Sequence, residues 1–235
     1  MRPLLPFIFS LLSVFNLRAA PPGQQDPDLR WNGEKPNILW IMIEDWSTDL
    51  SCYGTPLIHT PHIDQLAGEG IRYEWAFTTS PVCSTSRSAM MTGFHQNYIG
   101  ANQHRTARKK PLPHGIKPIP QLLAEAGYYT ATMAGKKTDC NFTTEKKLFM
   151  GTSWKNRKAG QPFYVQATFA DTHRNFVRDP ERPIDADQVK VPPYYPDLPL
   201  VRRDWANGLE TAQVVDRKVG SMLRQLDEDG LAEST

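Results

Sequence analysis

The chain has 235 residues, of which 40% are hydrophobic and 22% are charged, a composition that suits one globular domain with a sizeable core. The formal net charge of +2 gives no global electrostatic basis for binding nucleic acid or an anionic membrane. The 3 cysteines are too few, and odd in number, for a disulfide framework, so at least one thiol is unpaired. Composition therefore excludes a disulfide scaffold and a strongly basic nucleic-acid binder.

Residues 1–20 have the pattern of a secretory signal peptide. Arg2 supplies a positive start, residues 4–15 form an almost uninterrupted apolar run, and Ala19 and Ala20 follow as small residues. The run is shorter than the roughly 20 apolar residues that a membrane anchor needs. We therefore expect an exported protein, periplasmic or secreted, without a stable membrane anchor. A polar linker over residues 21–35 would lead to the folded domain at 36–235.

The next segments alternate between strand and helix patterns. Residues 37–43 form an apolar run bounded by Pro36 and two acids, which is typical of a strand buried on both faces of a parallel sheet. The further expected elements are a short helix over 60–67 ending near Gly70, a strand over 71–76, a helix over 86–92 after Cys83, a helix over 119–126, and strands over 128–133 and 163–169. This order predicts an α/β fold with a mostly parallel central sheet flanked by helices.

The last part of the chain has apolar residues at helical spacing. The pattern runs over residues 200–231, and Asp229 with Gly230 marks its end. A long amphipathic helix normally leads into further structure. We therefore expect a truncated chain that is the N-terminal portion of a longer domain.

Polar residues follow three of the expected strands. They are Glu44 and Asp45 after the first strand, Lys136 and Lys137 after the strand at 128–133, and His173 after the strand at 163–169. Ligand sites of parallel sheets lie beyond the carboxyl ends of the strands, so we expect these residues to converge on one edge with Cys83. Separately, each is more commonly a solvated acid, a surface cation or a structural histidine. Together they are typical of metal-assisted hydrolysis of a phosphate or sulfate ester.

Cys83 lies in the most informative segment, PVCSTSRSAMMTG over residues 81–93. At a helix start, unpaired backbone N–H groups and the positive end of the helix dipole favour anionic groups. Arg87 lies one turn further along, on the same helix face. An anionic or oxyanion-forming nucleophile at Cys83 fits this position. The alternative is a buried structural cysteine followed by an ordinary capped helix.

Five ordered segments resemble motifs of the type I sulfatase family. CSTSR at 83–87, followed by SAMMTG, resembles the family signature Cys-x-Pro-x-Arg and its helix. The other matching segments are KPNI at 35–38 leading to Glu44 and Asp45 and then CYG at 52–54, TPHIDQLA at 60–67, GYYT at 127–130 with KTD at 137–139, and the strand leading to His173. The resemblance covers roughly residues 35–229 and implies an alkaline-phosphatase-like fold.

The resemblance implies a sulfuric ester hydrolase that uses formylglycine, made from Cys83 by a maturation enzyme. One oxygen of the hydrated aldehyde would attack sulfur, and the other would later expel sulfate by re-forming the aldehyde. Arg87 would hold the hydrate, while Lys137 and His173 would contact the sulfate and assist the leaving group. Lys136 takes the lysine role if the register differs by one. His104 would line the substrate pocket, with an ordinary loop histidine as the equal alternative.

The resemblance also implies a Ca²⁺ ion, or Mg²⁺, held by Asp45, Glu44 and the modified Cys83. The substrate would be a sulfated small molecule or glycan, with a carbohydrate sulfate favoured. The chain departs from the family pattern in three places: Thr85 replaces the proline of the maturation signal, Glu44 replaces the first aspartate, and the later metal motif and downstream lysine are absent. From these departures we expect half a metal site and no robust activity from this chain alone.

Two alternatives stay open from the sequence. One is a phosphodiesterase or phosphonate hydrolase of the same superfamily, because some of these enzymes share the modified cysteine. The other is a non-catalytic sulfatase-like protein that binds sulfated glycans, which is favoured if Cys83 remains a thiol.

Overall fold

The computed structural model describes residues 33–135 and 137–235, so the predicted signal peptide, most of the predicted linker and Lys136 lie outside the described residues. Residues 35–235 form one compact unit. Among the described residues, no helix combines the length and the apolar character needed to cross a membrane.

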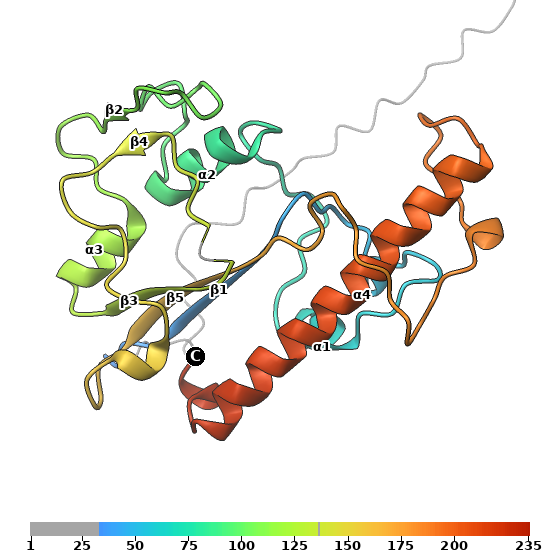
Figure 1. Ribbon diagram of the computed structural model, residues 1–235. Coiled ribbons are helices and arrows are strands. Elements are labelled where there is room, and N and C mark those ends of the chain that lie inside the picture. The colour runs from blue at the N-terminus through green and yellow to red at the C-terminus, as the bar shows by residue number, and fades with distance from the viewer. Residues whose placement is uncertain (1–32, 136) are drawn as a thin grey trace, which may run out of the picture. The chain divides into compact units, whose positions relative to one another are not determined.

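The order of elements follows the expected alternation (Figure 1). The strands are β1 (Ile38–Ile43), β2 (Lys110–Pro111), β3 (Tyr129–Ala134), β4 (Phe142–Thr143) and β5 (Phe163–Phe169). The α-helices are α1 (Pro61–Glu69), α2 (Cys83–Thr92), α3 (Ile119–Glu125) and α4 (Pro199–Glu228). The short 3₁₀ helices are η1 (Ser51–Tyr53), η2 (Trp154–Asn156), η3 (Ala186–Gln188) and η4 (Ala232–Ser234).

The main sheet is parallel, with the strand order β1-β5-β3 in the described part of the chain. Ile43 of β1 pairs with Phe169 of β5, and Ala134 of β3 pairs with Thr168. The three carboxyl ends are therefore level with one another. The predicted α/β fold with a parallel sheet is confirmed, and the register brings the residues that follow these strands to one edge.

The central strand β5 is buried over its whole length. Its residues Phe163, Val165, Ala167 and Phe169 pack in apolar clusters with residues of α4, including Val215 and Val219. Tyr164 and Gln166 point to the opposite face, as the period of two in a strand requires. Figure 1 shows α1 and α4 on one side of the sheet and α2 and α3 on the other.

The two ends of the compact unit meet beside the amino ends of the strands. The Asn37 backbone N–H donates to the Ser234 carbonyl over 2.7 Å, and the Asn37 side-chain oxygen accepts from the Phe163 backbone N–H over 3.1 Å. One asparagine therefore joins the start of β1, the start of β5 and the turn after α4.

The expected strand over residues 71–76 is wrong, because this segment is irregular in the structure. Its large hydrophobic side chains are exposed: Ile71 and Trp75 are each 81% exposed, and Tyr73 is 66% exposed. The apolar alternation is real, but among the described residues no neighbouring strand completes the backbone pairing that a strand requires. The other predicted helices and strands are confirmed to within a few residues, and α2 begins at Cys83 itself rather than at Ser86.

Candidate active site

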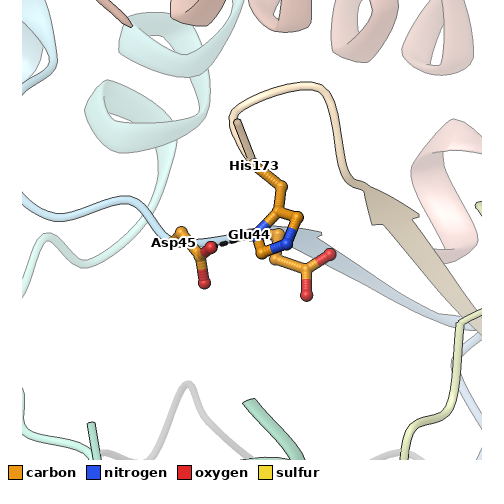
Figure 2. A group of neighbouring side chains, drawn as sticks. All are labelled: Glu44, Asp45 and His173. Atoms are coloured by element: carbon orange, nitrogen blue, oxygen red, sulfur yellow. Dashed lines mark hydrogen bonds and ion pairs between the residues drawn. The ribbon is translucent and has the colours of Figure 1, made fainter. Parts of the chain in front are cut away.

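The acidic pair after β1 and the histidine after β5 form one cluster, as Figure 2 shows. Ligand atoms of Glu44, Asp45 and His173 all lie within 4.8 Å of one another. Glu44 is buried, whereas Asp45 and His173 are exposed. The Asp45 carboxylate contacts Nδ1 of His173 directly. The convergence expected from the strand ends is therefore present for these three residues.

Backbone contacts between β1 and β5 hold this cluster in place. The Glu44 backbone N–H donates to the Phe169 carbonyl over 3.0 Å, and the Thr172 hydroxyl donates to the Glu44 carbonyl. Asp45 then takes a φ of 51°, a left-handed conformation that non-glycine residues adopt only when their surroundings compensate for the strain. Asp45 is thus exposed beside the buried Glu44, and their ligand atoms still lie within 4.8 Å of each other.

Cys83 is the first residue of α2, and its thiol donates to Oδ1 of Asp45 over 3.5 Å. Burial and the neighbouring Asp45 carboxylate raise the pKa of this thiol above its usual value. The unmodified thiol is therefore protonated and weakly nucleophilic at neutral pH. The helix N-terminus beside it still favours an anionic group, because its N–H groups and dipole point at this position.

Arg87 and Lys137 bring positive charge to the same carboxylate. Arg87 is only 5% exposed, and its guanidinium lies 3.8 Å from Oε1 of Glu44, which also pairs with the Lys137 ammonium. The Arg87 guanidinium donates to the Lys137 backbone carbonyl over 3.3 Å, and the Gln166 side chain approaches the same carbonyl at 3.4 Å. The segment after β3 is thus anchored to both α2 and β5.

Gly135 permits the close approach of this segment to the sheet. Its N–H donates to the Thr168 carbonyl over 2.8 Å, and a Cβ at this position would lie 3.0 Å from the same oxygen. A side chain here would push the Lys137 segment away from β5.

The carboxylates of Glu44 and Asp45 are suitable ligands for a hard divalent cation, whereas His173 is less suitable. Oε2 of Glu44 is buried and has no hydrogen-bond partner among the described residues, which is costly unless a ligand satisfies it. Carboxylate oxygens are the ligands that Ca²⁺ and Mg²⁺ prefer, whereas the imidazole of His173 is better suited to contact a substrate. Glu44 and Asp45 are therefore the residues that could hold such an ion.

A cavity of about 690 Å³ opens beside this cluster. Glu44, Asp45, Cys83 and Arg87 line one part of it. Aromatic side chains form another part, namely Trp46, Phe176, Tyr195 and Trp205. The cavity can therefore take a small anionic group against Arg87 and an organic group against the rings.

The sequence is similar to those of known proteins over most of its length. Residues 36–151 match the sequence profile of the sulfatase family. An ulvan-active sulfatase from Formosa agariphila is 30% identical over 254 residues, which cover 86% of this chain and 42% of that protein. The chain belongs to the sulfatase family. It spans less than half the length of this relative.

Solved structures of low identity share the fold. One, a complex with the substrate D-glucosamine-2-N,6-O-disulfate, has a TM-score of 0.64 and 18% identity, covering 86% of this chain and 64% of that one. The phosphonate monoester hydrolase from Silicibacter pomeroyi has a TM-score of 0.69 and 16% identity, covering 86% of this chain and 61% of that one. At such identities these two structures bear on the fold alone.

The structure brings most of the predicted site residues together. Cys83, Arg87, Lys137, His173, Glu44 and Asp45 are linked by the contacts described above. His104 is exposed, and among the described residues neither it nor Lys137 nor His173 belongs to the cavity wall. Lys136 lies outside the described residues. Lys137 pairs with Glu44, and the alternative role of Lys136 stays a prediction.

Thr85 occupies the position at which the sulfatase maturation signal has proline. It is the third residue of α2, where the backbone N–H has no partner within a helix, so both residues are compatible with this backbone. The Thr85 hydroxyl donates to the Val82 carbonyl and contacts the Ser80 hydroxyl, each over 2.8 Å. The fold of the signature is thus kept without the proline.

Sequence reasoning missed three residues that support the site. Thr172 holds the Glu44 backbone, Gln166 contacts the Lys137 carbonyl, and Asp139 lies 3.9 Å from the Lys137 ammonium. Thr172 and Asp139 adjoin predicted site residues in the chain, but Gln166 is marked only as a polar residue within an apolar strand.

Proposed function

We propose that this chain is the nucleophile-bearing part of a sulfatase that hydrolyses a sulfate ester of a carbohydrate. The observation that carries the proposal is the position of Cys83 at the N-terminus of α2, 3.5 Å from Asp45, in the wall of a cavity that Arg87 also lines. The ulvan-active sulfatase and the glucosamine disulfate complex among the similar proteins support a carbohydrate substrate.

In the proposed reaction, a maturation enzyme oxidises Cys83 to formylglycine, and one oxygen of the hydrate attacks sulfur. Arg87 holds the hydrate, because its buried guanidinium lies on the same helix face as residue 83. Lys137 neutralises charge on the sulfate oxygens. The contact of His173 Nδ1 with Asp45 orients the ring, and the doubly protonated ring donates its Nε2 proton to the leaving oxygen. A Ca²⁺ or Mg²⁺ ion held by Glu44 and Asp45 would supply positive charge beside the sulfate.

The decisive experiment is a mass spectrum of the peptide that contains Cys83, from protein made in its native host. We expect the mass of the aldehyde or its hydrate in place of the thiol. In the full-length gene product, the Cys83→Ala variant should lose hydrolysis of an aryl sulfate, whereas Cys52→Ala, a control at another partly buried cysteine, should retain it. An unmodified thiol together with full activity in Cys83→Ala would overturn the mechanism.

A second candidate is a phosphodiesterase or phosphonate hydrolase. The fold of the phosphonate monoester hydrolase, with its TM-score of 0.69, favours keeping this candidate. Rates on an aryl sulfate and on an aryl phosphodiester, measured with the same protein, separate the two. A dominant phosphodiester rate would replace the first proposal with the second.

A third candidate, a non-catalytic protein that binds sulfated glycans, is favoured by Thr85 in place of proline. It requires an unmodified Cys83 and measurable binding of a sulfated oligosaccharide without turnover.

We also propose that the protein is exported, because residues 1–20 have the pattern of a signal peptide. N-terminal sequencing of the mature protein should find a start near residue 21, and an intact Met1 would contradict export by this route.

A further inference from the structure

The side-chain direction of Lys137 is decided by two carboxylates. Its ammonium pairs with Oε1 of Glu44 and lies 3.9 Å from Oδ2 of Asp139. The backbone of Lys137 is held in place, because its carbonyl accepts hydrogen bonds from Arg87 and Gln166. The ammonium at the end of the flexible stem can therefore move between the two carboxylates while the backbone stays in place.

One of these carboxylates has a competing role. Glu44 and Asp45 are the residues that could hold a divalent cation, so an ion bound by Glu44 would repel the Lys137 ammonium from its present partner. Among the described residues, Asp139 is the other carboxylate within ion-pair distance of Lys137. An ammonium displaced from Glu44 therefore has one nearby anionic side chain to move to.

Arg105 holds that second carboxylate in a two-point contact. The Arg105 Nε donates to Oδ1 of Asp139 over 2.9 Å, and Nη2 donates to Oδ2 over 2.7 Å. This paired geometry is the strongest that an arginine and a carboxylate form. The Asp139 side chain is only 12% exposed, whereas the Arg105 side chain is 48% exposed. The arginine thus fixes the carboxylate from the solvent side.

Several contacts hold the backbone around the Arg105–Asp139 pair in a strained conformation. Arg105 has a φ of 50° and Asp139 a φ of 51°, both left-handed and both costly for residues other than glycine. The Asn141 side chain compensates, because it donates to the Gln103 carbonyl over 2.7 Å and accepts from the Thr106 backbone N–H over 3.0 Å. These contacts join the loop that carries Arg105 to the segment that carries Asp139.

Asp139 is ionised and can therefore act as a counter-ion to the Lys137 ammonium. Burial acts to raise the pKa of this carboxyl, but the hydrogen bonds and charge of Arg105 outweigh it, and the pKa lies below its usual value. The charges of Lys137 and His104 act in the same direction. Asp139 therefore remains ionised near neutral pH.

We propose that Arg105 and Asp139 form a positioning pair for Lys137, which receives the ammonium when a cation occupies Glu44 and directs it toward the substrate oxyanion. The role of the ammonium at the oxyanion rests on the proposed function, whereas the exchange between Glu44 and Asp139 does not. Asp139 and Arg105 act through Lys137 and make no contact with the reacting atoms in this scheme.

The test is a double-mutant cycle on Ca²⁺ affinity, measured by calorimetry on the full chain. Asp139→Asn should weaken Ca²⁺ binding at least about fivefold, the lower end of coupling between two linked events, because the ammonium then competes more strongly for Glu44. Lys137→Gln should strengthen Ca²⁺ binding. In the Lys137→Gln background, Asp139→Asn should have little further effect.

The cycle separates positioning from simple electrostatics. The charge of Asp139 could also attract the cation directly, but that effect would persist after Lys137 is removed. Arg105→Lys, which keeps the charge and loses the two-point contact, should change Ca²⁺ affinity in the same direction as Asp139→Asn by a smaller factor. Glu125→Gln is the matched control, because Glu125 also pairs with a lysine but belongs to α3.

Three outcomes would overturn the proposal: an equal effect of Asp139→Asn in both backgrounds, no effect in either, or no Ca²⁺ binding by the unaltered chain. Thermal unfolding of each variant checks that the fold is intact. Because the readout is cation affinity, failure of the sulfatase proposal, seen as an unmodified Cys83, can be distinguished from failure of the positioning pair.

Discussion

Two buried glutamates in this protein have opposite surroundings. Both oxygens of Glu210, on α4, are satisfied: Oε1 accepts from Arg178 and the Ile184 N–H, and Oε2 accepts from Arg178 and the Asp179 N–H. Glu44, at the end of β1, has both nearby cations at Oε1, while Oε2 is buried without a hydrogen-bond partner among the described residues. A satisfied buried acid stabilises a fold, whereas an unsatisfied one beside a cavity is suited to receive a ligand.

The largest expected effect is a loss of Ca²⁺ affinity when Glu44, but not Glu210, is replaced. Glu44→Gln should weaken Ca²⁺ affinity by roughly 100-fold, since loss of even an indirect supporting contact at a metal site costs 10- to 100-fold. Calorimetric titration measures it. Glu210→Gln is the matched control at a buried acid and should bind Ca²⁺ as the unaltered chain does. Equal losses in the two variants would remove the distinction between the sites.

The free energy of unfolding should fall more in Glu210→Gln than in Glu44→Gln, the reverse of the order expected for cation affinity. Glu210→Gln should lower the free energy of unfolding by about 2–3 kcal/mol, because its new NH₂ group would face a backbone N–H that has lost its acceptor. Urea denaturation measures this change. Glu44→Gln should cost less, since its second oxygen already lacks a partner among the described residues. A larger loss in Glu44→Gln would contradict the structural role assigned to Glu210.

The pH dependence of stability should also follow the α4 network. Arg217 lowers the pKa of Asp179, and for Glu210 the hydrogen bonds from Arg178 and the backbone outweigh the burial that would raise its pKa. A lowered folded pKa contributes stability above the unfolded value near 4 and loses it as the pH falls through the folded value. Asp216, whose pKa is raised by burial, has the opposite sign.

We therefore expect the urea midpoint to fall as the pH is lowered from about 5 to about 3, with a shallower fall in Glu210→Gln. Urea titrations at a series of pH values measure it. An identical slope in Glu210→Gln and the unaltered chain would show that other groups control acid unfolding.

The smallest effect is expected at an exposed pair. Lys117 and Glu125 lie 2.6 Å apart, but their side chains are 47% and 52% exposed. Glu125→Gln should change the free energy of unfolding by less than about 0.5 kcal/mol, because water screens such pairs. Urea denaturation in low and high salt measures it. A loss as large as that of Glu210→Gln would mean that burial does not decide the difference between these acids.

The sheet and its polar edge could be predicted well from the sequence, because both depend on local patterns. The apolar runs that form β1 and β5 are short and continuous, and parallel strands align their carboxyl ends, so the amino-acid pattern alone places Glu44, Asp45 and His173 together. The same reasoning failed at residues 71–76, where an alternating apolar pattern exists without a pairing strand in the described part of the chain.

Other features of the site depend on contacts between distant segments. Arg105 and Asp139 are 34 residues apart, and Lys137 and Glu44 are 93 apart. No periodic pattern indicates which acid a given cation will meet, since that depends on how the loops after β1 and β3 fold over the sheet edge. Thr172 and Gln166 were missed for the same reason.

The order of strands and helices, the family and the position of Cys83 at a helix start all follow from the amino-acid sequence, because hydrophobic periodicity and motif spacing are local properties of the chain. Three properties of the site come instead from the folded arrangement: Arg87 is buried, one oxygen of Glu44 is left for a ligand, and Lys137 lies between two carboxylates. These properties arise from desolvation and from the distances between charges, which the packing of remote segments sets.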